Sequence, residues 1–107
     1  MDEQQYLKRA DETFKRIEDM LDPVDAEDVD CERAGDVLTL TFKNGVKCIV
    51  NTQRPTRQIW LAANARAWHF DYDAGSGTWK DDKGQNVELY AKVGSIVKEA
   101  ASIDLAF

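Results

Sequence analysis

The chain has 107 residues, of which 43% are hydrophobic, and a formal net charge of −6. This length fits a single domain over residues 1–107, and ten aromatic side chains argue for a folded core. The acidic balance argues against binding to nucleic acid or to an anionic membrane surface, because both attract basic proteins. The sequence has no apolar run near the roughly 20 residues of a membrane span, and its acidic start is unlike a targeting signal, so we expect a cytoplasmic protein.

The first expected element is a helix over residues 3–21. Its apolar residues recur with the spacing of one helical face, namely Leu7, Ala10, Phe14, Ile17 and Leu21. The dipeptide Asp22-Pro23 ends the helix, because the residue before a proline disfavours helical geometry.

Strand periodicity follows, starting where Val29 and Cys31 alternate with Asp28, Asp30 and Glu32. Strands over 38–42 and 46–50 surround Asn44-Gly45, which is the strongest short signal for a hairpin. After a break at Pro55, further strands are expected over 58–62, over 67–72 and around 78–80.

The last expected element is a helix over 86–101, with Asn86 as its N-cap and apolar residues at Leu89, Val93, Ile96 and Ala100. Tight turns between short strands predict an antiparallel sheet of about six strands. Two amphipathic helices cover one face of such a sheet, which gives an α+β fold, a two-layer α-β sandwich with the other face open. In a reducing cytosol, Cys31 and Cys48 are expected as free buried thiols.

Acidic residues are concentrated in the first third of the chain. Residues 1–32 hold 12 Asp/Glu against 4 Lys/Arg, whereas the remainder holds 8 against 10, and residues 17–32 contain no base at all. Acids at a helix C-terminus each cost about 0.3–1 kcal/mol against the helix dipole. Such a violation without local compensation is expected at functional sites. The acidic ridge defined by these side chains comprises Glu18, Asp19, Asp22, Asp25, Asp28, Asp30 and Glu32.

Two binding chemistries fit the acidic ridge, beside the simpler interpretation of a solvated acidic edge. Carboxylate oxygens are hard donors that suit Ca²⁺, Mg²⁺, Mn²⁺ and iron. The spacing is not that of a calcium loop, and no His/Cys set suggests zinc. A metal site here would be weak, with one or two carboxylates per ion. The alternative ligand is a basic protein, attracted electrostatically and released at high salt.

A second patch lies on the face that the helices leave open. If Ile59 and Leu61 point to the core, Gln58 and Trp60 point away from it. An exposed Trp among polar residues is typical of an interface, although packing within the sheet is the alternative. His69 is expected on the same face, in a structural role or, less simply, in a metal or proton role. No catalytic constellation accompanies these residues.

Two stretches of the chain form a specific pattern, with support from two shorter ones. The main stretches are Asn51-x-Gln53-x-Pro55-x-x-Gln58-x-Trp60-Leu61-Ala62 and Trp68-His69-Phe70-Asp71, and the supporting ones are Asp30-Cys31-Glu32 and Leu38-Thr39-Leu40-x-Phe42-x-Asn44-Gly45. Through these motifs the sequence resembles the frataxin family, in its short bacterial form, over nearly the whole chain. This resemblance implies the α-β-α sandwich and a regulator of iron–sulfur cluster assembly rather than an enzyme.

The resemblance also implies partners and sites. Iron, ferrous or ferric, would bind weakly to the whole acidic ridge. A cysteine desulfurase would dock on Glu18, Asp19 and Asp22. The surface of Asn51, Gln58 and Trp60 would face the desulfurase and the iron–sulfur scaffold protein, with Trp60 near the scaffold. A monomer is expected, with iron-dependent oligomers as a further possibility. The alternatives are a ferroxidase or iron-storage protein, and an acidic interaction adaptor without a metal role.

Overall fold

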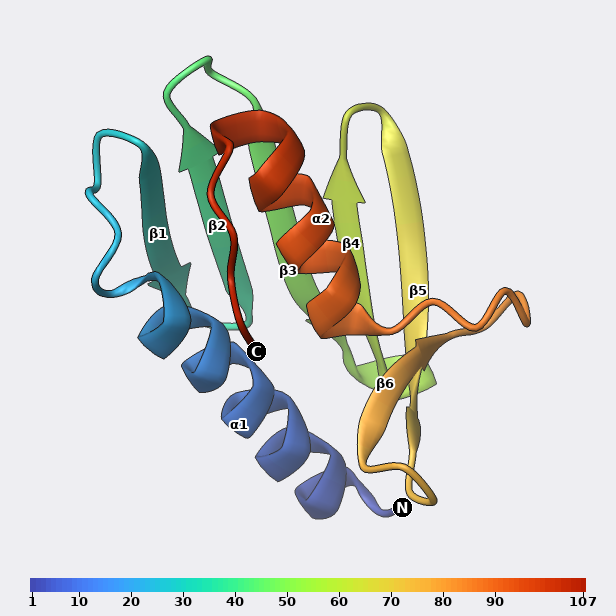
Figure 1. The fold of residues 1–107 in the computed structure, drawn as a ribbon. Helices are drawn as coiled ribbons and strands as arrows, with labels where there is room; N and C mark the ends of the chain where they lie inside the picture. Colours follow the sequence, from blue (N-terminus) through green and yellow to red (C-terminus); the bar gives the residue numbers. More distant parts are fainter.

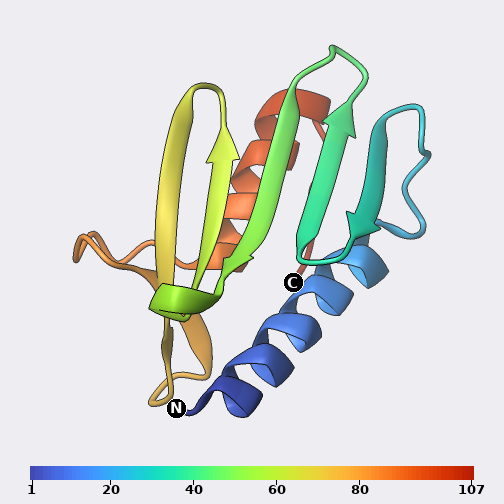
Figure 2. The same cartoon turned by 180° about the vertical axis from the view of Figure 1, so that it is seen from behind.

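Two helices and six strands make up the structure, a computed structural model that describes residues 1–107. In chain order the elements are α1 (Glu3–Leu21), β1 (Val29–Ala34), β2 (Val37–Phe42), β3 (Lys47–Gln53), the 3-10 turn η1 (Arg54–Thr56), β4 (Gln58–Ala63), β5 (Arg66–Asp73), β6 (Thr78–Asp81) and α2 (Leu89–Ala101). The strands form one antiparallel sheet in sequence order, so β1 and β6 are its edges. Both helices cover one face (Figure 1), and the other face carries no helix (Figure 2). The predicted two-layer α+β sandwich is confirmed.

Helix α1 begins with a capping box and buries one face. Asp2 accepts a hydrogen bond from the backbone N–H of Gln5 at 2.8 Å, and the Gln5 side chain accepts one from the backbone of Asp2 at 3.2 Å. The expected core position Leu7 is only half-buried, and Tyr6 is fully buried instead. Tyr6 donates its hydroxyl to the carbonyl of Gln58 at 2.7 Å, which ties the start of α1 to β4.

Two hairpin turns depend on backbone in the left-handed region. The predicted β2–β3 hairpin is confirmed: Gly45 has φ +84°, and the Asn44 side chain accepts a hydrogen bond from the backbone N–H of Val46 at 3.0 Å. Between β4 and β5, Asn64 and Ala65 have φ of 53° and 61°, the positive values that a two-residue type I′ turn requires. Alanine is an unusual choice for that second position, so the sequence pattern left this turn without a clear signal.

The expected start of the second helix is wrong by three residues. Asn86 has φ +58° and lies in a loop, whereas Glu88 is the N-cap, accepting hydrogen bonds from the backbone N–H groups of Tyr90 and Ala91. The loop wraps around the carboxylate of Asp81, which accepts from the backbone of three residues, Lys83, Gln85 and Val87. The α2 helix therefore begins only after Val87, the last residue that donates a hydrogen bond to the Asp81 carboxylate.

The core is one cluster of twenty buried apolar side chains between the sheet and the helices. Phe14 lies in it, as the apolar face of the first helix predicts, and Phe70 of β5 is fully buried there as well. Trp68 is only partly buried, and the fully packed tryptophan is Trp79 of β6. Trp79 donates its indole N–H to Thr13 at 2.9 Å, the one buried polar side chain, and so joins β6 to α1.

The thiols and the last residues also lie against this core. Cys48 is buried, Cys31 is half-buried, and both are free, as expected. After α2 the chain turns back toward α1 (Figure 1), and Phe107 stacks on Tyr90 with ring centres 4.9 Å apart. Neither helix has the length and apolarity to cross a lipid bilayer.

Candidate functional site

The acidic ridge follows the end of α1, the loop after it and the edge strand β1. Asp28 was expected on the strand but lies in the turn before it, because β1 begins at Val29. Asp25 has a local structural role: its carboxylate accepts a hydrogen bond from the backbone N–H of Glu27 at 2.9 Å. Its backbone carbonyl accepts a further bond from Val29 at 3.0 Å, so Asp25 shapes the entry to β1.

The carboxylates of the acidic ridge do not all share one face. In β1, Val29 and Cys31 are the positions packed toward the core, and by alternation Asp30 and Glu32 lie on the opposite, open face of the sheet, where they are exposed. The α1 acids instead lie in the helical layer. The ridge therefore passes around the edge of the sheet, and no group of three or more Asp, Glu, His or Cys converges on one point that could hold a metal ion.

A groove of about 250 Å³ separates the end of α1 from β1. Glu18 and Asp22 line it together with apolar side chains and Cys31, and Asp30, whose side chain lies on the other face of β1, borders it at the edge of the sheet. Burial, together with the nearby charges of Glu18 and Asp30, raises the pKa of the Cys31 thiol to about 11. The thiol is consequently protonated at neutral pH, which leaves carboxylate oxygens as the available donors of the groove.

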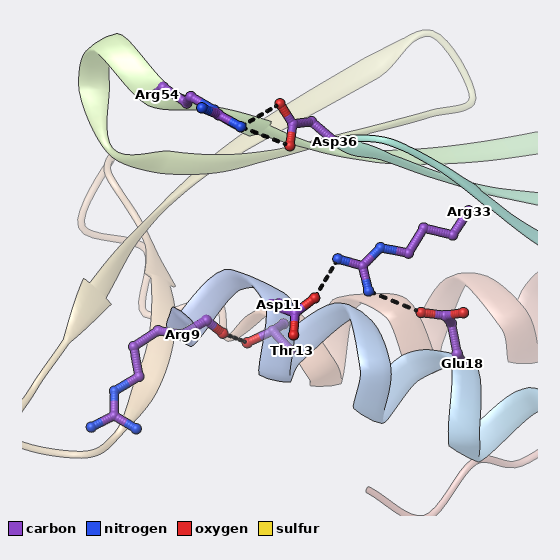
Figure 3. Close-up of polar contacts among 7 residues, drawn as sticks. All are labelled: Arg9, Asp11, Thr13, Glu18, Arg33, Asp36 and Arg54. Atoms are coloured by element: carbon purple, nitrogen blue, oxygen red, sulfur yellow. Dashed lines mark hydrogen bonds and ion pairs between the residues drawn. The ribbon is translucent and has the colours of Figure 1, made fainter. Parts of the chain in front are cut away.

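Arg33 neutralises part of the negative charge at α1, which the sequence predicts to be without a nearby base. One guanidinium nitrogen lies 2.6 Å from Asp11 Oδ1 and another lies 3.3 Å from Glu18 Oε1 (Figure 3). Burial lowers the pKa of Arg33, but the hydrogen bonds and charges of the two acids outweigh it, so the net pKa is raised above its ordinary value. Sequence reasoning missed this bridge, although Arg33 has the same alternation as Val29 and Cys31 and so points toward α1.

The open face holds the second predicted patch as a connected cluster. Trp60 stacks on His69 with ring centres 4.1 Å apart and 17° between the planes. Its indole N–H donates to Gln58 at 2.9 Å, and the Gln58 amide donates to Asp71 and Asp82, each at 3.1 Å. The orientation predicted for Gln58, Trp60 and His69 is confirmed, since Ile59 and Leu61 between them are fully buried.

Asn51 lies directly opposite Trp60 in the β3–β4 register, so all three predicted contact residues are brought together. Asp71 and Asp82 were missed. Asp71 shares the alternation of His69 and could have been placed on this face, whereas Asp82 reaches it from a turn that no periodicity describes.

The comparison with known proteins decides the family. The sequence profile of the frataxin-like domain matches residues 1–102. The chain belongs to the frataxin family. An iron–sulfur cluster assembly protein, CyaY, of Paraburkholderia phymatum is 41% identical over 101 residues, which cover 94% of this chain and 92% of that one.

Solved frataxins share the fold. Frataxin from Psychromonas ingrahamii superposes with a TM-score of 0.89 at 30% identity, over 98% of this chain and 96% of that chain. A trimeric frataxin from the yeast Saccharomyces cerevisiae, complexed with ferrous iron, gives a TM-score of 0.64 at 23% identity, over 96% of this chain and 88% of that one. The predicted membership of the frataxin family is thus confirmed, together with the fold.

Proposed function

We propose that this frataxin-family protein is an iron-binding regulator of iron–sulfur cluster assembly, which docks on a cysteine desulfurase through the acidic ridge. The role in cluster assembly is supported by the bacterial relative, which is an iron–sulfur cluster assembly protein. The observation that carries the docking surface is the concentration of acids at one edge of the sheet. There Asp19 and Asp22 are exposed at the C-terminal end of α1, where the helix dipole disfavours negative charge.

Iron binding at the ridge would be weak and regulatory. Asp19, Asp22, Asp30 and Glu32 offer exposed hard oxygen donors, and no three of them converge. Each ion would therefore take one or two carboxylates and complete its shell with water. An ion bound in this way changes the charge that the acidic ridge presents to a partner, without any bond being made or broken in the protein.

Docking would use two surfaces with different physics. Lys and Arg side chains of the desulfurase would pair with Glu18, Asp19 and Asp22, so that binding weakens as salt screens the charges. On the open face, Trp60 is half-exposed and held by two neighbours, which suits an aromatic anchor for the scaffold protein, with Asn51 and Gln58 beside it.

The test is calorimetric binding to the desulfurase of the same organism, with and without ferrous iron, in low and moderate salt. Asp19→Lys/Asp22→Lys should weaken binding more than about tenfold, because like charges face each other in the complex. The matched control, Glu99→Lys/Asp104→Lys, changes the net charge equally near the end of α2 and should bind like the unmodified protein.

Unchanged binding of the ridge variant would refute docking through the acidic ridge. If iron leaves the backbone amide signals of the ridge unperturbed, the protein is an adaptor without a metal role. Iron-dependent oxygen consumption far above a protein-free blank, with growth of large particles, would instead identify a ferroxidase or an iron store.

A further inference from the structure

We propose that Arg33 is an internal competitor for the acidic ridge: its guanidinium occupies Glu18 and Asp11, so a divalent cation must displace it to use those carboxylates. This inference rests on the proposed binding of cations at the ridge and concerns its regulation. Of the seven ridge carboxylates, Glu18 alone forms an ion pair, and its partner is Arg33.

The strand register and a contact with α1 fix the position of the Arg33 side chain. Arg33 pairs with Leu38 in the β1–β2 register and is oriented beneath α1. Its guanidinium lies 5.2 Å from the centre of the Phe14 ring, and only 29% of its side chain is exposed. A stacked and half-enclosed guanidinium has lost part of its rotamer freedom, so less entropy is lost when it pairs.

The geometry makes Arg33 equivalent to a bound cation. Asp11 and Glu18 lie two helical turns apart on α1, and separate nitrogens of one guanidinium reach them at 2.6 and 3.3 Å (Figure 3). A divalent ion that approaches Glu18 therefore meets a fixed positive charge. Because arginine stays protonated at any physiological pH, the competition does not vary with pH.

The consequence is an order of occupancy along the acidic ridge. Cations should bind first at Asp19 and Asp22, which have no paired base, and on the outer face at Asp30 and Glu32. Glu18 joins only at higher concentration, after the Arg33 side chain has moved.

The experiment titrates Mn²⁺ as a paramagnetic probe into the full chain and follows both its affinity by calorimetry and the broadening of backbone amide signals. Arg33→Met keeps the apolar stem over Phe14 and removes the charge. We expect the affinity to rise about twofold to fivefold, the factor that corresponds to a partly exposed ion pair. Broadening should extend from Asp19 and Asp22 to Asp11 and Glu18. Arg33→Gln, measured alongside, should behave in the same way.

The matched control is Arg54→Met, which removes one base from a comparable exposed pair with Asp36 at 3.3 Å, away from the ridge (Figure 3). It should leave the Mn²⁺ affinity unchanged. A second comparison places Arg33→Met in an Asp11→Asn/Glu18→Gln background. In that background Arg33→Met should no longer raise the Mn²⁺ affinity. If the affinity rose only because the net charge of the protein becomes more negative, the rise would persist.

The outcomes separate this inference from the proposed function. If the unmodified protein and Arg33→Met bind Mn²⁺ equally and with the same broadened signals, the inference is overturned while cation binding at the acidic ridge stands. If only Arg33→Met binds, the inference stands and cation binding by the unmodified protein fails. If neither binds, both fail.

Discussion

Replacing Thr13 by valine should destabilise the fold through a single buried hydrogen bond. Thr13 is 4% exposed and Trp79 is 2% exposed, and the indole N–H donates to the Thr13 hydroxyl at 2.9 Å. The hydroxyl itself donates to the carbonyl of Arg9 at 2.8 Å, so it both donates and accepts a hydrogen bond. Valine has the same shape and no acceptor, which leaves the indole N–H buried without a partner at a cost of about 1–3 kcal/mol.

This cost can be isolated in a double-mutant cycle with Trp79→Phe, measured by urea denaturation followed by far-UV circular dichroism. In the phenylalanine background no N–H is left unpaired, so Thr13→Val should cost close to nothing there. The difference between the two backgrounds should be at least about 1 kcal/mol, and each kcal/mol lowers the melting temperature by about 4–8 °C. An equal cost in both backgrounds would show that the hydrogen bond does not secure α1 to β6.

Three further predictions concern other parts of the chain. Hydrogen bonds from backbone N–H groups, above all that of Val87, lower the pKa of Asp81 in the folded state. The ionised carboxylate therefore stabilises the fold at neutral pH, and this stabilisation is lost as the pH falls through the lowered pKa. The difference in unfolding free energy between the unmodified protein and Asp81→Asn should shrink below about pH 4, measured by urea denaturation at a series of acidic pH values. Burial raises the pKa of Cys48 to about 12 and contributes most to raising that of Cys31 to about 11. At pH 8 the lower thiolate fractions should slow the reaction with an aromatic disulfide reagent, relative to the denatured protein, about a hundredfold at Cys31 and about a thousandfold at Cys48, and comparable rates would contradict the buried state. Ala65→Gly relieves a left-handed φ of 61° and should stabilise the protein by about 1 kcal/mol in the same denaturation assay, whereas a loss of stability would refute the turn assignment.

The fold could be predicted because its main signals are local. The helical period up to Leu21, the stop at Pro23 and the turn at Asn44-Gly45 each act within a few residues. The errors arose where distant contacts overrule local preference. Asn86 has the chemistry of an N-cap, but the preceding loop is held by the carboxylate of Asp81, so the helix starts later.

The sequence predicted most of the residues that form the candidate site, but it did not predict the hydrogen bonds and salt bridges between them. Alternation alone correctly separated Trp60 and Gln58 from the core. It could not reveal that the Gln58 amide joins Asp71 to Asp82, because Asp82 comes from a turn outside any strand register. The salt bridge of Arg33 likewise needs the separation between β1 and α1, which no pattern along the sequence contains.

The placement of the two surfaces bears on how partners would share the protein. Asp30 and Glu32 on β1 lie on the same open face as Trp60 on β4, three strands away, which is about 14 Å across the sheet. Asp19 and Asp22 are reached from the helical side of the same edge. A basic partner at the edge therefore need not cover Trp60, and under the proposed function the desulfurase and the scaffold could bind together. An ion at Asp19 and Asp22 would then weaken the first contact while leaving the aromatic contact intact, which is what a regulator that responds to iron requires.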